Sequence, residues 1–564
     1  MGKLLGIGHL ILCVMLCLLT GWADAESLQG PSTSSGLAGS RPNIVLVMTD
    51  DQGMGDLSCM GNEILKTPHI DRFYAQSTRF ADFHVSPTCA PTRSAMMSGR
   101  PPFEVGVTHT IFQRERLAPA AITFPEALQQ AGYTTGLFGK WHLGDEEAYL
   151  PQNRGFDEVL MHGAGGIGQY GFGDFKANTE NTYFDNVLLH NDTIVKTKGF
   201  CTDVFFHAGL AWIKEQVSGV SVQVSGKEEG EEESGVSVSA KGGPASGGQV
   251  SGKEEGGQES TASNPHPVSR TPFFAYISLN APHGPMIAPD KYKKRFLDQG
   301  YDEKTAARYG MIENIDDNMG LLMEKLTAWN TLENTLVIFM TDNGMSMGAG
   351  KKNGEPFHRH NAGLRGGKNS PWEGGTHVPA FWRWQGVLGE GVDVPALTAH
   401  LDLYRTFCDL AGADVPESKL PPKGRSLVPL LENPKAKWLD RRLFIHQGRW
   451  GGGRNKASLE DSQYANCAVR SQRWRLVFSG RKGKLQTHLS DISADPGEAT
   501  NVADQYPEVV KDLTAAYDQW WDSLGPLLVN EGLPKVAPED HPLTVRYEKQ
   551  LAEEGIPDWS PEEL

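Results

Sequence analysis

Four apolar runs of strand length, each ending in polar side chains, constrain the fold of this chain more than any other feature. The runs are RPNIVLVMTDD, TTGLFGKWHLG, FFAYISLNAPHGP and TLVIFMTDNG, and segments long enough for helices separate them. Continuous Val, Ile, Leu and Phe runs are typical of strands that are buried on both faces of a sheet. The pattern therefore predicts an α/β fold with a large mixed, mostly parallel sheet sandwiched by helices.

The polar residues that end these runs are candidates for a functional site. In chain order they are Asp50, Asp51, Lys140, His142, His283, Asp342 and Asn343. Taken singly, Asp-Asp is a common helix cap or turn, and Asp-Asn-Gly is a common turn. Ligands of parallel sheets, however, bind beyond the carboxyl ends of the strands. Because the coincidence occurs four times at that same end, we predict that these side chains meet at one edge of the sheet.

Four of these residues offer only hard oxygen ligands. They are Asp50, Asp51, Asp342 and Asn343, from two strands whose ends could be adjacent. Carboxylate and amide oxygens suit Ca²⁺, and also Mg²⁺, whereas zinc favours nitrogen and sulfur. We therefore predict a Ca²⁺ site, with Mg²⁺ as the alternative ion.

The net charge limits the partners of this chain. A formal charge of -16 and a pI near 5.6 argue against a nucleic-acid-binding protein, which would present a basic face. An anionic substrate would need a local cationic pocket, since the field of the whole protein repels it. Arg93, Lys140 and Lys368 are the candidates, while His358, His360 and His377 are interpreted as structural or surface histidines.

Residues 86 to 100 read SPTCAPTRSAMMSGR, and here the chain resembles the type I sulfatases, arylsulfatase-like members of the alkaline phosphatase superfamily. The pattern C-x-P-x-R runs from Cys89 to Arg93. DDQG, GKWHLG, NAPHGP, TDNG, GGK and EGGTHVP follow the order of that family, so the resemblance covers roughly residues 41–430. The resemblance implies an alkaline phosphatase-like fold with a smaller C-terminal α+β domain. The stretch HLSDISADPGEATNVADQYPEVVKDL resembles the second domain of that family.

The resemblance implies a role for each candidate residue. Cys89 would be oxidised to formylglycine by a separate maturation enzyme and would serve as the nucleophile. Arg93 and Lys140 would hold its hydrate, and His142 would be the base. His283 and Lys368 would bind the sulfate, with Lys140, and would assist the leaving oxygen. Asp50, Asp51, Asp342 and Asn343 would be the Ca²⁺ ligands. One serine of some family members has no counterpart in GFDEVLMHGAGGIGQYG.

The predicted activity is the hydrolysis of sulfate esters to inorganic sulfate and an alcohol or phenol. A sulfated small molecule or glycan would be the substrate, and we expect a sulfated carbohydrate. Two alternatives stay open. A formylglycine-dependent phosphonate monoesterase or phosphodiesterase can also carry C-x-P-x-R, and a catalytically inactive glycan-binding relative would keep the pocket with an unmodified Cys89.

The remaining sequence predicts an exported protein in several parts. Residues 1–25 resemble a signal peptide with an A-x-A cleavage site, and their apolar run is too short for a membrane anchor, so no integral membrane protein is expected. The destination would be periplasmic or secreted in a bacterium, and secretory or lysosomal in a eukaryote. The predicted parts are a flexible lead-in over 26–40, a catalytic domain over 41–430, a C-terminal subdomain over 431–530 and a tail over 531–564.

An insertion interrupts the predicted catalytic domain at residues 217–266. It lacks aromatic residues, Leu, Ile and Met, and it carries 3 Lys against 8 Glu. A segment of this composition cannot bury enough apolar surface to offset its ordering entropy, so it is expected to be disordered. Because it enters the third strand from its amino end, it is also expected to lie far from the site.

Overall fold

The computed structural model describes residues 36–218 and 271–561, apart from 112, 181, 347, 349, 452–456, 481–484 and 535. A ten-stranded sheet dominates it, in the order β13-β2-β12-β9-β1-β8-β4-β5-β6-β7. The strands predicted from the four apolar runs are β1 (Asn43–Thr49), β4 (Thr134–Lys140), β8 (Phe273–Ser278) and β9 (Thr335–Thr341). They are contiguous and parallel, as β9-β1-β8-β4, and form the centre of the sheet.

The other strands extend this parallel centre on both sides. On one side β5 (Glu158–His162) continues it in parallel, and β6 (Val187–His190) and β7 (Thr193–Lys196) follow antiparallel. On the other side β12 (Ala380–Arg383) and β2 (Thr78–Phe80) pair antiparallel, and β13 (Val392–Val394) ends the sheet. The sheet is therefore mixed and mostly parallel at its centre, as predicted.

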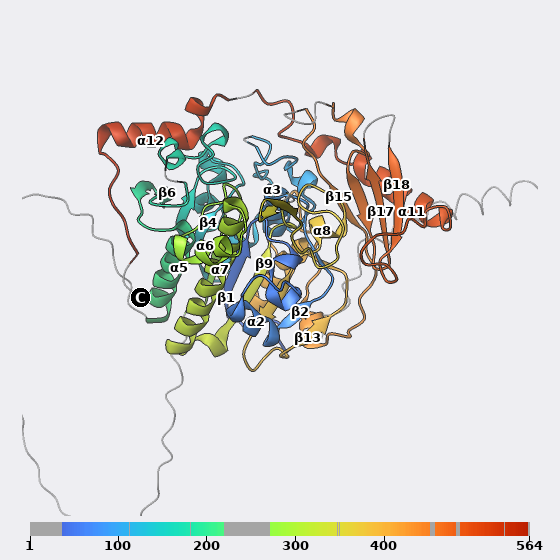
Figure 1. Ribbon diagram of the computed structural model, residues 1–564, viewed down its shortest axis with the longest axis horizontal. Coiled ribbons are helices and arrows are strands. Elements are labelled where there is room, and N and C mark those ends of the chain that lie inside the picture. Colours follow the sequence, from blue (N-terminus) through green and yellow to red (C-terminus); the bar gives the residue numbers. More distant parts are fainter. Residues whose placement is uncertain are drawn as a thin grey trace, which may run out of the picture.

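Helices cover both faces of the sheet, because alternate side chains of each central strand enter different cores. Ile44, Leu46 and Met48 of β1 pack into one core with α4 (Phe124–Gln130) and α9 (Leu403–Ala411). Val45 and Val47 pack into a second core with α2 (Pro68–Ala75), α5 (Cys201–Ser218) and α7 (Glu303–Ala328). Figure 1 shows α5 and α7 lying along one face of the central strands.

A second, smaller domain follows the large sheet, as the predicted fold class requires. Its antiparallel strands are β15 (Leu443–His446), β16 (Cys467–Arg470), β17 (Trp474–Ser479) and β18 (Gln486–Asp491), in that order. The helix α11 (Pro507–Asp522) packs on this sheet through Leu513, Tyr517 and Trp520. Figure 1 shows this domain at the right of the large sheet.

The last helix returns to the opposite end of the molecule. α12 (Pro542–Glu553) lies beside β6 and β7, far from the four-stranded sheet (Figure 1). Gln550 exchanges hydrogen bonds with the backbone of Ile194, at 2.8 and 2.7 Å. Much of the segment predicted as a C-terminal tail is thus packed against the edge of the large sheet.

Several predictions fall on residues outside the described ranges. The signal peptide over 1–25 and most of the lead-in lie there, and so does the insertion apart from its first two residues, Val217 and Ser218. Within the described ranges, no helix combines the length and the apolar character that crossing a bilayer requires.

Candidate active site

The carboxyl ends of the central strands bring the predicted site residues together. Asp50 and Asp51 follow β1, Lys140 ends β4, and Asp342 and Asn343 follow β9. Cys89 is the first residue of α3 (Cys89–Ser98), and Arg93 lies one turn further along the same helix. Possible ligand atoms of Asp50, Cys89 and Asp342 lie within 4.8 Å of one another, and so do those of Asp50, Asp51 and His283.

Cationic side chains hold the carboxylates of this group. Lys140 Nζ lies 2.5 Å from Asp50 Oδ2, and Lys368 Nζ lies 2.5 Å from Asp51 Oδ1. Arg93 donates to Asp342 Oδ2 at 2.9 Å. These contacts match the expected placement of three local cations in an acidic protein.

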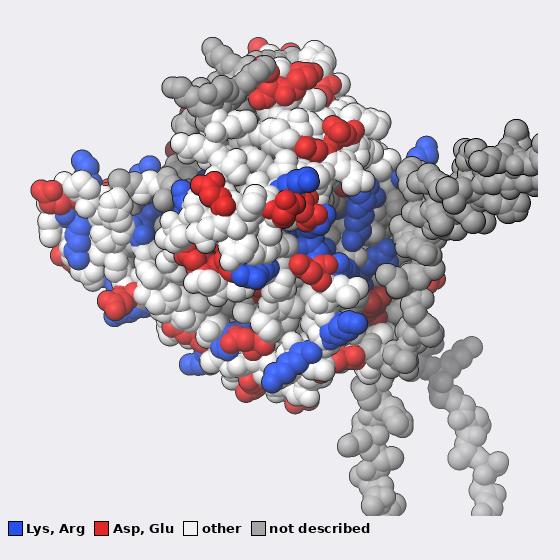
Figure 2. All heavy atoms as spheres, turned by 90° about the vertical axis from the view of Figure 1, so that its right-hand side faces the viewer, with Lys and Arg blue, Asp and Glu red and all other residues white. Residues whose placement is uncertain are grey.

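Figure 2 shows acidic and basic side chains interspersed over the face that the four-stranded sheet occupies, with several basic side chains near its centre. The cations inside the site act on an anion more strongly than those of the surface, because the low dielectric of the interior strengthens their effect.

The donor set fits a hard divalent cation. Asp50 Oδ1 and Asn343 Oδ1 are buried without a hydrogen-bond partner, as unoccupied metal ligands would be. Burial, together with the neighbouring Asp50, raises the pKa of Asp342 to about 7. A divalent ion among these oxygens would stabilise the ionised form of Asp342, because it would compensate the buried negative charge.

The described residues of this group differ in their exposure to solvent. The nucleophile candidate Cys89 is 2% exposed, and Asp50 and Lys140 are fully buried. The side chain of His283, in contrast, is 16% exposed and that of Lys368 is 9% exposed. A sulfate-sized group would therefore pass His283 and Lys368 before it reached Cys89.

His142 is prepared to accept a proton. Its Nε2 lies 3.2 Å from the carbonyl oxygen of Thr110, which can only accept, so Nε2 carries the proton. Its Nδ1 is buried without a partner. Burial, helped by Lys140 and Arg93, holds the pKa of His142 well below its ordinary value, so the ring is neutral with a free lone pair at Nδ1.

Sequence reasoning missed several residues that position this group. Arg93 Nη1 donates to Ser278 Oγ at 2.5 Å and to Tyr276 Oη at 3.2 Å, both from β8. Polar residues on alternate positions of the otherwise apolar run FFAYIS were the available signal. The Thr110 carbonyl carried no signal at all, because backbone contacts cannot be read from residue types.

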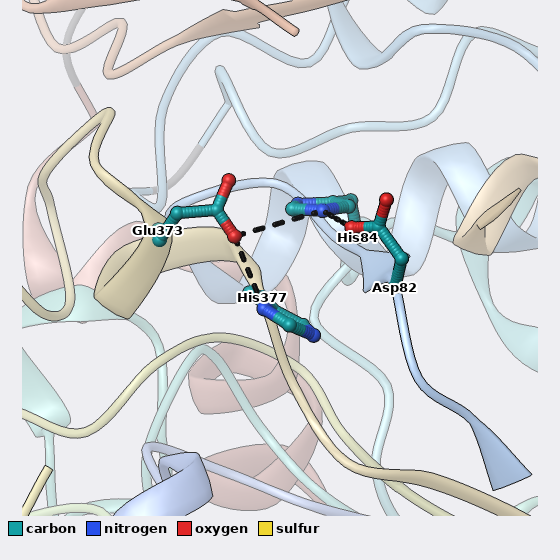
Figure 3. A group of neighbouring side chains, drawn as sticks. All are labelled: Asp82, His84, Glu373 and His377. Atoms are coloured by element: carbon teal, nitrogen blue, oxygen red, sulfur yellow. Dashed lines mark hydrogen bonds and ion pairs between the residues drawn. The ribbon is translucent and has the colours of Figure 1, made fainter. Parts of the chain in front are cut away.

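A second group of ligand-type side chains lies apart from this site and is better explained as an ion-pair junction. Asp82, His84, Glu373 and His377 face one another (Figure 3), with possible ligand atoms within 4.8 Å. Arg470 donates to both Asp82 and Glu373, and Arg475 pairs with Glu373 at 2.9 Å. Because two buried guanidinium groups already neutralise the carboxylates, a metal ion would meet strong competition. The group ties the large sheet to β16 and β17.

Comparisons with known proteins identify relatives of this chain. The sulfatase family profile matches residues 42–219 and 264–413, and a profile described as N-sulphoglucosamine sulphohydrolase, C-terminal, matches residues 368–521. The chain is 30% identical to steryl-sulfatase of Rattus norvegicus in an alignment of 432 residues that covers 70% of each chain. It is 26% identical to N-acetylgalactosamine-6-O-sulfatase of Bacteroides thetaiotaomicron, over 88% of this chain and 96% of that protein.

Solved structures share the fold. The structure of Ps i-CgsB in complex with k-i-k-neocarrahexaose superposes with a TM-score of 0.66 at 24% identity, over 91% of this chain and 98% of that one. BT4656 in complex with D-glucosamine-2-N,6-O-disulfate superposes with a TM-score of 0.61 at 18% identity, over 87% and 100%.

Proposed function

The chain belongs to the sulfatase family and is a hydrolase of sulfate esters, and we propose that it works through a formylglycine made from Cys89 and a bound Ca²⁺. One observation carries the proposal. Cys89, the cysteine of C-x-P-x-R, has its Sγ within 4.8 Å of carboxylate oxygens of Asp50 and Asp342. Arg93, Lys140 and Lys368 form ion pairs with the carboxylates of this same group.

Formylglycine supplies, as its hydrate, two hydroxyls on one carbon, one for attack on sulfur and one whose deprotonation releases the sulfate. A Ca²⁺ held by Asp50, Asp51, Asp342 and Asn343 would supply positive charge that polarises the sulfate oxygens. The maturation enzyme that oxidises Cys89 is part of this proposal.

The side chains around Cys89 divide the remaining work. Arg93 and Lys140 are fixed and buried, so they stabilise negative charge that develops beside residue 89. His142 takes the proton of the second hydroxyl at Nδ1, because its Nε2 is held by Thr110. His283 and Lys368, at the entrance, bind the sulfate and stabilise or protonate the leaving oxygen.

We propose a sulfated carbohydrate as the substrate class. The N-acetylgalactosamine-6-O-sulfatase that aligns over 96% of its own length supports this choice, and human N-acetylgalactosamine-6-sulfatase is 29% identical over 72% of this chain. The steryl-sulfatases of rat and mouse align over 70% and 81% of their lengths, less than the 96% of the bacterial N-acetylgalactosamine-6-O-sulfatase. Hydrolysis of a phosphonate or phosphate diester remains the alternative activity to be measured beside it.

The test is sulfate release by protein produced together with a formylglycine-generating enzyme. We expect turnover of N-acetylgalactosamine 6-sulfate and of an aryl sulfate, and none by Cys89→Ala, with phosphate diesters at most a side activity. Failure to release sulfate from any ester by protein shown to carry the aldehyde would contradict the proposal, as would faster phosphate diester hydrolysis.

The Ca²⁺ site has its own test, which does not depend on turnover. Asp50→Asn should abolish Ca²⁺ binding in equilibrium dialysis, because it removes charge from the buried oxygen cluster. Wild-type protein should gain about 3 kcal/mol of stability at free Ca²⁺ of about 100 times Kd. Equal thermal stabilisation of Asp50→Asn and wild type by Ca²⁺ would place the ion elsewhere.

A further inference from the structure

A small cationic pocket lies beside the active site, and none of the roles above uses it. The cavity measures about 80 Å³, and its lining includes Lys304, Thr305, Arg308, Ser346 and Arg359. Lys304, Thr305 and Arg308 come from the first two turns of α7, a 26-residue helix whose amino end favours anions. The cavity is of the size of one oxyanion group, and cations from two separate segments surround it.

Arg308 fixes this pocket directly to the catalytic loops. Its Nη2 donates to the backbone oxygen of Asp51 at 2.6 Å, and its Nη1 donates to that of Pro282, next to His283, at 3.2 Å. Ser346, which accepts from Arg308 Nη1 at 3.1 Å, lies three residues beyond Asn343. The pocket therefore adjoins the loops that carry His283 and the Ca²⁺ ligands.

The pocket also adjoins the segments that carry His283 and Lys368. Met286, three residues beyond His283, also lines the cavity. The backbone nitrogen of Lys368 donates to Met345, the neighbour of Ser346, at 2.9 Å. His283 and Lys368 are the more exposed residues of the catalytic group, so the pocket adjoins the side from which we expect a substrate to enter.

Donors in this pocket lack acceptors. Arg308 is 3% exposed, yet its Nε has no hydrogen-bond partner, and Arg359 Nη1 is also buried without one. Arg359 is held through Nη2 by the carbonyl of Ser346. Among the described residues, Lys304 and Arg359 form no ion pair. Burial and the nearby Arg308 lower the pKa of Arg359 to about 10, as expected for like charges held close together.

Two carboxylates nearby are already engaged. Asp56 pairs with Arg308 at 2.8 Å, and Asp302 caps α7 by accepting from the backbone nitrogen of Thr305 at 3.0 Å. The pocket has three cations, Lys304, Arg308 and Arg359, against these two carboxylates, so it keeps a positive charge and free hydrogen-bond donors. A bound oxyanion would neutralise that charge and accept hydrogen bonds from those donors.

We propose that this pocket binds a second anionic group of the substrate, a sulfate or carboxylate carried next to the sulfate ester that is cleaved. The inference rests on the proposed function and deepens it: the preferred substrate is a carbohydrate with at least two anionic groups. A monosulfated aryl ester engages only the catalytic group around Cys89, and it leaves the pocket empty.

The test compares substrates that differ by one anionic group. N-acetylgalactosamine 6-sulfate is compared with the 4,6-disulfate and with a chondroitin 6-sulfate disaccharide, which adds a carboxylate. Wild-type kcat/KM should be about tenfold higher for at least one dianionic substrate. Arg359→Gln should remove this advantage through KM, and it should leave 4-methylumbelliferyl sulfate turnover within twofold of wild type.

Matched variants and inorganic sulfate complete the experiment. Arg473→Gln, which alters an exposed arginine of the four-stranded sheet, should preserve the advantage. Equal losses on all substrates in Arg359→Gln, or no dianionic advantage in active wild-type protein, would overturn the inference. Inorganic sulfate could also inhibit the wild type non-competitively. If Arg359→Gln abolished that inhibition but left the substrate preference unchanged, the pocket would bind free sulfate, and the inference would again be overturned. Wild-type protein inactive on every ester would instead contradict the proposed function.

Discussion

His142 shows how a single backbone contact prepares a catalytic side chain. The Thr110 carbonyl holds Nε2, so the lone pair is at Nδ1, which is buried and has no hydrogen-bond partner. His142→Ala should lower kcat by about 10²- to 10⁴-fold with a smaller change in KM, because proton removal is lost and sulfate binding is not. Steady-state kinetics with an aryl sulfate measures this, and a kcat within threefold of wild type would exclude His142 as the base.

Glu115 is a buried carboxyl whose protonation should make stability depend on pH. Burial and the neighbouring Asp145 raise its pKa to about 8, and Oε2 has no partner. The folded state therefore binds the proton more tightly than the unfolded chain. The stabilisation of the folded state by this bound proton is fully present below the ordinary glutamate pKa of about 4.3, and it is lost as the pH rises to about 8.

Glu115→Gln should remove that dependence. The variant should lose less stability than wild type between pH 5 and pH 8, by about 1–3 kcal/mol, because a neutral amide needs no proton. Urea unfolding at several pH values measures the difference, with the exposed Glu554→Gln as the control. Parallel pH profiles for wild type and Glu115→Gln would show that Glu115 ionises freely in the folded protein.

At the scale of elements, the central strands show what could be predicted from the sequence. The runs that became β1, β4, β8 and β9 are apolar at nearly every position, and this identified them as buried parallel strands. Their order in the sheet could not be read, because pairing depends on which crossover helices pack on which face. The ends of β1 and β9 are adjacent in register, from Asn43 with Thr335 to Thr49 with Thr341. This adjacency brings the predicted metal ligands together.

The positioning contacts were beyond sequence reasoning for a different reason. Ser278 and Arg308 form hydrogen bonds with residues far from them in the chain. Ser278 accepts from Arg93 Nη1, and Arg308 donates to the Asp51 carbonyl. Neither belongs to a motif whose chemistry can be recognised. The charges of Lys304 and Arg359 were likewise visible, but only the fold shows that they face one cavity.

Gly139 illustrates how closely β4 and β8 approach each other at the site. Its φ is +118°, and a Cβ there would lie 1.9 Å from the carbonyl oxygen of Ser278. Gly139→Ala should destabilise the protein by more than about 1 kcal/mol and should displace Lys140. Thermal unfolding and kcat measure the two effects. Gly171→Ala, where a Cβ meets no atom within 4 Å, is the control, and equal behaviour of the two variants would contradict this explanation.

At the scale of the whole molecule, the active site and the described boundaries of the predicted insertion lie at opposite ends of the central strands. Both boundaries of the insertion line one cavity, with Gln216 and Val217 on one side and Thr271 and Pro272 on the other. This cavity adjoins Asn43, at the amino end of β1, whereas Asp50 follows its carboxyl end. Strand direction thus separates the boundaries from the catalytic group.

Replacing residues 219–266 by a short Gly-Ser linker should therefore leave the enzyme nearly unchanged. We expect kcat and KM within twofold of wild type and a similar melting temperature, because the two boundaries already lie at one cavity and the site is at the other edge. Kinetics and thermal unfolding check this. A folded deletion variant with a large loss of turnover would show that the insertion acts at the site.

The mass of the tryptic peptide from Phe80 to Arg93, taken from protein of the native source, shows directly whether Cys89 is converted to formylglycine. We predict that residue 89 carries an aldehyde, so that one oxygen replaces one sulfur and two hydrogens of cysteine. A peptide with an intact Cys89 thiol throughout would contradict the proposed mechanism, and the catalytically inactive glycan-binding relative would then become the better explanation.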